Sequence, residues 1–462
     1  MSLPDARRDG DARTDVVTDV LDVHDDVLDV LGIGFGPSNL ALAIAADEQA
    51  VADPDRALRV AFVERQPCFG WHRGMLIDDA TMQISFLKDL VTQRNPASPF
   101  SFLSYVHERG RLADFINHKV LFPLRIEFHD YLEWAAARFE HLVAYGQTVT
   151  DVRPVTDGGV VVAYEVAARD RAGRTVVRRA RNVVVAVGLA PSLPAGVTPG
   201  PRVWHNLDIL SRVETLPAAP EPRRFVVVGA GQSAAEVVDF LHRRFATAEV
   251  CSVFARWGYT PADDTPYANR IFDPEAVDVY FEADDAVKRM LFDYHRNTNY
   301  SVVDGDLINE LYRREYQEKV QGRPRLRMLN ASQVVAADAA ADGVAVDVEF
   351  LPTGERTRLE ADAVVYATGY APSDPLRLMG QAGDLVTRRP DGALALERDY
   401  RLVLDAPAEA ALYLQGGTEH AHGITSTLLS NLAVRSGEIV ESVVARRAAA
   451  PLPRPVGVAA AG

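Results

Sequence analysis

A glycine-rich turn between an apolar run and a helical pattern lies near the start of the chain and constrains the fold more than any other feature. Residues 27–33 suit a buried parallel strand, and residues 40–46 suit a helix that packs on its own sheet. Between them, Gly34-x-Gly36-x-x-Asn39 has the spacing of a dinucleotide-binding turn, with Asn39 in place of the third glycine. Gly34 permits the tight turn, and Gly36 lets the backbone approach a pyrophosphate at the helix N-terminus.

The next apolar segment, LRVAFVER, contains Glu64 about 25 residues after the turn, where such folds carry an acid that binds ribose hydroxyls. Two glycines in a turn are common, so a plain strand-turn-helix without a ligand is the alternative interpretation. The preceding strand, the following helix and Glu64 together favour a dinucleotide site.

A second unit, RRFVVVGAGQSAAEVVDFLHRR, repeats the strand, turn and helix as Gly229-x-Gly231-x-x-Ala234. Two such units predict two bound nucleotides. The strand after the second turn ends at Arg256, where the first unit has Glu64. An arginine there can pair with a ribose 2′-phosphate, which favours NADPH over NADH and leaves FAD for the first unit; a surface arginine after a strand is the alternative.

Composition excludes several classes of protein. The chain has 462 residues, which favours two or three domains, and its net charge of −15 argues against nucleic acid or an anionic membrane as the main partner. Cys68 and Cys251 lie far apart and have no metal-ligand spacing, so neither a disulfide framework nor a metal site is expected. The sequence shows no targeting segment or membrane span, and a cytoplasmic location is expected.

We therefore expect an α/β protein with two Rossmann-like dinucleotide-binding domains, one for FAD and one for NADPH, and a small, mostly helical substrate-binding region. The Pro-rich segments PSLPAGVTPGPRV and LPAAPEPRR mark crossings between the domains. The predicted boundaries are a disordered lead at 1–25, the FAD domain at 26–215 and 350–446, an inserted NADPH domain at 216–349 with the substrate segment at about 262–325, and a flexible tail at 447–462.

Several long and unusual motifs, taken with the two glycine turns, make the resemblance specific. They are MQISFLKDLVTQRNPASPFSFLSYV, DDTPYANRIFDPE, NTNYSVVD, DAVVYATGY and HAHGITSTLLSNLAVR. The chain resembles the amino-acid N-hydroxylating flavin monooxygenases, and among them the L-ornithine N5-monooxygenases of siderophore and related peptide biosynthesis. The resemblance runs from about residue 28 to about residue 446, with Tyr366 at a position where the family has Leu or Phe.

This resemblance implies that NADPH reduces FAD, that O2 gives a flavin hydroperoxide, and that the side-chain amine of L-ornithine becomes N5-hydroxyornithine while NADP+ stays bound. It also implies a homo-oligomer, with a tetramer favoured. A lysine N6-monooxygenase or a diamine N-hydroxylase is the nearest alternative, because one methylene is worth only about 1–3 kcal/mol. More distant alternatives are a disulfide reductase, which needs a redox cysteine pair, and a non-catalytic flavoprotein redox module.

The resemblance also assigns site residues. Lys88 binds the substrate carboxylate, Asn269 holds the amino-acid end of the substrate, and Asn299 lies between the substrate and the nicotinamide. Gln83 lies beside the flavin ring, and Ser430 lies near both the substrate and the flavin, so Ser430 is also an expected substrate-binding residue. Gln83, Asn299 and Ser430 are the expected catalytic residues. Trp71 and His72, in an irregular stretch after the first unit, are placed against the flavin, and Ser233 faces NADPH with Arg256. The remaining expected cofactor contacts are Pro37, Gln232, Thr368, Gly369 and Tyr370.

Overall fold

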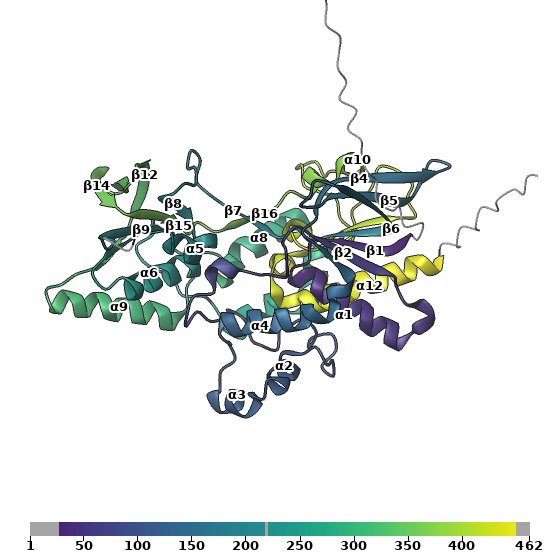
Figure 1. Cartoon of the computed structure of the whole chain (residues 1–462), viewed down its shortest axis with the longest axis horizontal. Helices are drawn as coiled ribbons and strands as arrows, with labels where there is room; N and C mark the ends of the chain where they lie inside the picture. Colours follow the sequence, from purple (N-terminus) through teal and green to yellow (C-terminus); the bar gives the residue numbers. More distant parts are fainter. Residues whose placement is uncertain (1–26, 218–219, 450–462) are drawn as a thin grey trace, which may run out of the picture.

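Two sheets of mainly parallel strands form the two units of the computed structural model, which describes residues 27–217 and 220–449 (Figure 1). In the first unit, β1 (Leu28–Ile33) lies between β2 and β6, and all three strands run parallel. The other strands of this sheet extend it on both sides: β2 (Val60–Glu64), β3 (Val143–Tyr145), β4 (Thr148–Asp157), β5 (Val160–Arg169), β6 (Thr175–Val185) and β17 (Ala411–Leu414).

The second unit is built on a five-stranded parallel sheet with β9 (Arg224–Val228) near its centre. Its strand order is β11 (Leu326–Leu329), β10 (Glu249–Val253), β9, β15 (Ala363–Tyr366) and β8 (Val203–His205). A separate antiparallel sheet consists of β12 (Ser332–Ala339), β13 (Val344–Phe350) and β14 (Glu355–Ala361).

The second sheet corrects the predicted boundaries at both ends. The strand β8 lies before residue 216 and β15 lies after residue 349, yet both pair within the sheet of the second unit. A short apolar strand such as AVVY fits the middle of either parallel sheet, so its hydrophobicity does not say which sheet it joins. The chain crosses between the units at β7 (Leu189–Pro191) and β16 (Tyr370–Pro372), which pair with each other.

Helices pack on the sheets and form much of the chain that connects their strands. Helix α1 follows the first glycine turn and packs against the C-terminal helix α12, whereas α6 follows the second turn (Figure 1). The longer helices are α1 (Pro37–Ala52), α4 (Arg125–Ala136), α6 (Gln232–Arg244), α7 (Pro274–Glu282), α8 (Asp285–His295), α9 (Gly305–Val320) and α12 (Leu432–Ala449). The shorter ones are α2 (Phe102–Glu108), α3 (Leu112–His118), α5 (Ile209–Val213), α10 (Gly380–Asp384) and α11 (Glu419–His422).

The predicted substrate segment at about 262–325 is mostly helical, with α7, α8, α9 and the 3-10 helix η5 (Ala268–Phe272). The predicted lead at 1–25 lies outside the described residues. The predicted tail at 447–462 also lies largely outside them, although α12 continues to residue 449.

Candidate active site

The first glycine turn has the geometry that its sequence predicts. Gly34 adopts a φ of +85°, and a Cβ there would lie 2.4 Å from the carbonyl oxygen of Ala186, so only glycine fits. A Cβ on Gly36 would meet no atom of the described chain within 4 Å, so open space lies at the N-terminus of α1. Pro37 occupies the start of that helix, where its missing N–H costs nothing.

Asn39 and Glu64 are both buried and brace this turn from within. The Asn39 amide donates to the carbonyl oxygen of Gly34 at 2.7 Å. Asn39 therefore stabilises the turn from the position where the usual fingerprint has its third glycine. The Glu64 carboxylate accepts backbone N–H bonds from Phe35 and Gln66, each at 2.7 Å. The structure therefore gives both residues a role in turn geometry, and their predicted contacts with the cofactor remain predictions.

The second turn is equally constrained but is covered by another segment. A Cβ on Gly229, whose φ is +145°, would lie 2.3 Å from the carbonyl oxygen of Ala367. A Cβ on Gly231 would lie 3.4 Å from the Cα of Ser301, so the substrate segment passes directly over this turn. Ser233 lies in the first turn of α6, where its backbone is suited to face a phosphate.

A partly buried polar cluster joins the two units beside this turn. The Arg125 guanidinium at the start of α4 binds Glu236 of α6 through two hydrogen bonds of 2.6 and 2.8 Å. Gln232 donates to both Glu236 and Asp304 at 3.1 Å, and Gln83 donates to Asp304 at 2.7 Å. Burial raises the pKa of Asp304. Gln83 of the first unit is thus linked through Asp304 to Gln232, which directly follows the second glycine turn.

His72 and the segment at 368–370 lie where the chain crosses between the units. His72 has a φ of +50°, and its ring lies 5.9 Å from that of Tyr370 and 4.6 Å from that of Trp71. Burial, with Arg125 and His129 nearby, lowers the pKa of His72 to about 4, so this imidazole is neutral at pH 7.

Thr368 and Gly369 have bonds to the chain itself. The Thr368 hydroxyl donates to the carbonyl oxygen of Ser192, and the Gly369 carbonyl accepts from the backbone of Ser192. The Tyr370 hydroxyl accepts from Asn206 at 2.9 Å. Residues 368–370 therefore stabilise the segment where the chain crosses between the two units. Contacts of Thr368, Gly369 and Tyr370 with a cofactor remain predictions.

Lys88 is brought to the predicted substrate segment. Its Nζ lies 5.3 Å from the centre of the Phe272 ring, at the end of the same η5 helix that carries Asn269. Among the described residues no carboxylate lies within 4 Å of this half-buried ammonium. Burial lowers the pKa of Lys88, and Asp273 opposes that shift. The ammonium is therefore available to pair with an anion brought by a ligand.

Asn299 and Ser430 approach the same region from other elements. The hydroxyl of Tyr300, next to Asn299, donates to Glu419, and the Thr427 hydroxyl donates to the same carboxylate oxygen at 2.7 Å. Thr427 ends the 3-10 helix η8 (Ile424–Thr427), which contacts η5. Ser430 lies in the neighbouring η9 (Leu429–Asn431) and is buried. The elements that carry Lys88, Asn269, Asn299 and Ser430 therefore converge.

Arg256 follows β10 and is exposed, as a residue that meets a ribose phosphate must be. Its Nη1 donates to the carbonyl oxygen of Ser301 at 2.8 Å. Arg256 thus connects β10 of the second unit to Ser301, in the segment that covers the second glycine turn.

The residues at the first turn and the segment at 415–431 fit a flavin dinucleotide. Besides the open space at Gly36, four buried side-chain oxygens of this segment have no hydrogen-bond partner among the described residues, which is costly unless a ligand supplies one. They are the side-chain oxygens of Thr418, Thr425, Ser426 and Asn431. The polar atoms that such a cofactor needs are therefore present.

Sequence reasoning did not single out Arg125, Glu236, Asp304, Gln415 or Glu419. Each is a common surface residue type, and their hydrogen-bond partners lie between 4 and 377 positions away along the chain. Only Glu236 carried a local signal, because it lies one turn into the helix that follows the second glycine turn.

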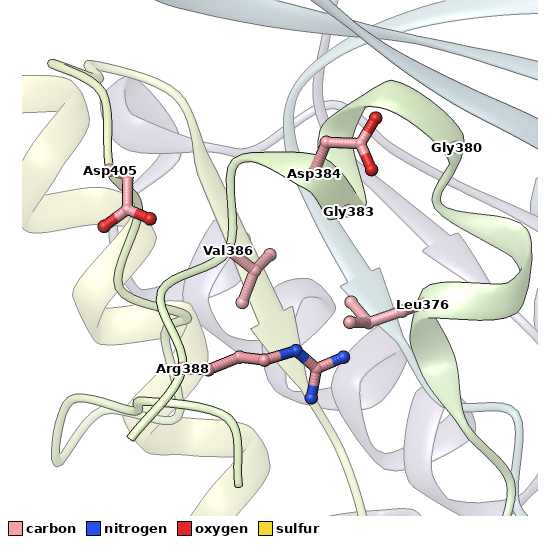
Figure 2. A pocket seen from close by; sticks show the side chains of 7 residues that line it. All are labelled: Leu376, Gly380, Gly383, Asp384, Val386, Arg388 and Asp405. Carbon is pink, nitrogen blue, oxygen red and sulfur yellow. The ribbon is translucent and has the colours of Figure 1, made fainter. Parts of the chain in front are cut away.

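A separate cavity lies away from these residues. Figure 2 shows this cavity of about 540 Å³, into which Arg388 points from a loop and which α10 borders. Its other charged lining residues are Asp384 and Asp405. None of the predicted site residues lines it, so it is not the candidate active site.

Comparison with known proteins decides the family. A family model described as L-lysine 6-monooxygenase/L-ornithine 5-monooxygenase matches residues 26–372. The chain belongs to this family. An L-ornithine N(5)-monooxygenase of Burkholderia cepacia is 43% identical over 408 residues, which are 86% of this chain and 90% of the relative.

Solved structures agree with this membership. The ornithine N-hydroxylase of Kutzneria sp. 744, described with reduced FAD, NADP+ and L-ornithine, is 46% identical with a TM-score of 0.87. The match covers 91% of this chain and all of that structure. An L-lysine 6-monooxygenase of Pseudomonas syringae is 31% identical, with a TM-score of 0.78 and coverage of 91% of this chain and 99% of its own.

The two-dinucleotide disulfide reductases share only the fold. A bacillithiol disulfide reductase of Bacillus cereus has a TM-score of 0.55 at 16% identity. Cys68 is exposed and Cys251 is buried, and neither forms a disulfide. Within the described ranges, no helix is long and apolar enough to cross a membrane, and no group of His, Cys, Asp and Glu side chains is arranged to hold a metal.

Proposed function

We propose that this chain is an FAD- and NADPH-dependent monooxygenase that converts the side-chain amine of L-ornithine to N5-hydroxyornithine with O2. The observation that carries the proposal is Lys88, a half-buried ammonium without a carboxylate partner among the described residues, next to the helix that bears Asn269. The 46% identity to an ornithine N-hydroxylase, against 31% to a lysine monooxygenase, favours ornithine over lysine. A role in siderophore or related peptide biosynthesis and a homo-oligomeric state belong to the same proposal.

FAD, when bound at the first turn, supplies the oxygen chemistry, and this chain's residues orient the amine. Lys88 pairs with the ornithine carboxylate, and Asn269 holds the amino-acid end. The distance from Lys88 to the reacting nitrogen then selects a chain of one length. NADPH would be held at the second turn, where Arg256 would pair with its 2′-phosphate.

The reacting amine must be neutral to act as a nucleophile. An alkylammonium has a pKa of about 10.4, so neutrality near pH 8 costs roughly 3 kcal/mol. The uncharged side chains of Asn299 and Ser430 bind this end without favouring the cation, whereas a carboxylate there would favour it. Burial of Ser430 adds to the same effect by disfavouring a charged amine.

The function is tested with purified enzyme by measuring NADPH oxidation and hydroxylamine formation with ornithine, lysine and putrescine. We expect coupled product formation with ornithine and at least tenfold lower kcat/KM with the other two amines, because lysine misplaces the reacting nitrogen and putrescine lacks the carboxylate. Hydroxylation of lysine at equal efficiency would reverse the substrate assignment. Absence of a hydroxylated product from all three amines would refute the proposed function.

We expect Arg256→Ala to raise the KM for NADPH about 10- to 100-fold, because a charge-assisted hydrogen bond contributes about 1.5–3 kcal/mol. The KM for NADH, which lacks the 2′-phosphate, should change less than about twofold. Arg256→Gln is the matched variant, since glutamine can still donate to the Ser301 carbonyl but carries no charge. Equal losses for the two nucleotides would assign Arg256 to the support of Ser301 alone.

A further inference from the structure

Arg435 is a buried cation whose hydrogen-bond partners are all neutral. It lies in the first turn of α12 and is 2% exposed. Its guanidinium donates to the Ser426 carbonyl at 2.5 Å, to the Gln415 side-chain oxygen at 3.3 Å and to the Ser38 hydroxyl at 3.4 Å. These bonds give each guanidinium nitrogen one partner but do not neutralise its charge.

No counter-ion accompanies this charge in the part of the chain that the structure describes, since no carboxylate lies within 4 Å of it. Two acidic groups, Tyr400 and Glu438, oppose the lowering of the Arg435 pKa. Burial raises the pKa of Tyr400 to about 12, so this phenol is neutral at pH 7, and Arg398 already holds the Glu438 carboxylate through hydrogen bonds of 2.8 and 3.0 Å. Complete burial lowers the pKa of Arg435, which still remains protonated because a guanidinium does not lose its proton in proteins. An uncompensated buried charge is costly, so an anionic ligand nearby would offset the cost.

The charge is located directly behind the first glycine turn. Ser38 is the second residue of α1, and Gln415, at the end of β17, donates to the Ser38 carbonyl at 3.1 Å and to Asn39 at 3.3 Å. Arg435 is therefore one hydrogen bond from a helix N-terminus whose N–H groups and dipole already favour an anion, beside the open space at Gly36.

We propose that Arg435 is a positioning residue that retains the FAD diphosphate, by supplying a buried positive charge behind the first glycine turn. It acts through Ser38 and Gln415 rather than by direct contact. Because protein on every side excludes water from this guanidinium, its field on the turn is screened less than that of an exposed arginine. The inference rests on the FAD site of the proposed function, but not on the identity of the amine substrate.

The experiment compares holoenzymes of the wild type, Arg435→Gln, Arg435→Lys and Arg446→Gln by FAD content on purification and by FAD release on dilution. We expect the FAD dissociation constant to rise at least tenfold in Arg435→Gln and less than threefold in Arg435→Lys, which keeps the charge. Arg446 lies in the same helix and binds the Glu409 carbonyl at 2.8 Å, away from the turn, so Arg446→Gln should match the wild type.

A second pair of variants tests the charge while Arg435 stays in place. Gln415→Met and Gln415→Glu both lose the amide that donates to Ser38, but only Gln415→Glu gives Arg435 a carboxylate. We expect FAD to be released at least fivefold faster from Gln415→Glu than from Gln415→Met. Equal release from this pair, or equal loss in Arg435→Gln and Arg435→Lys, would overturn the proposal, and a wild-type chain that holds no FAD would refute the proposed function with it.

Discussion

Replacement of Lys88 by alanine is expected to raise the dissociation constant for ornithine about 10- to 100-fold, because it removes a charged hydrogen-bond donor worth about 1.5–3 kcal/mol. Reduction of the flavin by NADPH should stay within about twofold of the wild-type rate, because Lys88 approaches Phe272 and not the second glycine turn. Stopped-flow reduction and ornithine titration measure the two quantities separately. Unchanged ornithine affinity would remove Lys88 from the site.

Lys88→Met is the control for this prediction, since methionine keeps most of the side-chain volume over Phe272 and loses only the charge. It should bind ornithine as weakly as Lys88→Ala. Burial lowers the pKa of Lys88, so ornithine affinity should be present at pH values below that lowered pKa and should decline as the pH rises through it. In Lys88→Met, the part of the decline in ornithine affinity that comes from loss of the Lys88 proton should be absent. The part that comes from titration of the ornithine amines should remain in both proteins.

Replacement of Glu236 by glutamine is expected to lower the free energy of unfolding by about 3 kcal/mol or more, because it leaves the Arg125 guanidinium buried without its counter-ion. Glu236 is 5% exposed, and the pair joins α4 of the first unit to α6 of the second. Urea unfolding of the FAD-loaded protein, followed by far-UV circular dichroism, measures the change.

Two controls separate burial from charge in this prediction. The pair of Arg179 and Glu165 is about a third to a half exposed, so Glu165→Gln should change the stability by less than about 1 kcal/mol. The double variant Arg125→Met/Glu236→Leu should recover most of the loss, because a buried ion pair is often replaced by apolar side chains at little cost. If Glu236→Gln lowered the free energy of unfolding no more than Glu165→Gln does, the pair of Arg125 and Glu236 would contribute little to stability.

The local chemistry of the two glycine turns was accessible from the sequence. Gly34 and Gly229 have positive φ angles, a constraint that belongs to the turn itself, whereas the carbonyl oxygens 2.4 and 2.3 Å from where a Cβ would lie come from Ala186 and Ala367, far away along the chain. The buried strands and the helices that follow them were likewise set by hydrophobic patterns over a few consecutive residues. Membership of the family followed from long contiguous motifs, which the comparisons confirmed.

Side-chain roles within those motifs were less accessible. Asn39 and Glu64, predicted as cofactor contacts, face inward and bond to the backbone of the turn that carries them. The Thr368 hydroxyl, in a motif predicted to contact a cofactor, donates to the carbonyl oxygen of Ser192, which follows the crossing strand β7, and its contact with a cofactor remains a prediction. A motif specifies that a residue is needed at a position, but the direction of its side chain depends on what packs against it.

The sequence by itself determined the two glycine turns and the helices and strands around them, because each depends on neighbours within one turn or strand. Only the tertiary structure decided that β8 and β15 belong to the second sheet, that Lys88 meets the helix of Asn269, and that Arg435 lies behind the first turn. Those facts depend on contacts between residues up to several hundred positions apart, such as the 397 positions that separate Ser38 from Arg435. No local pattern encodes them, because strand pairing and buried charge are settled only when the whole chain packs.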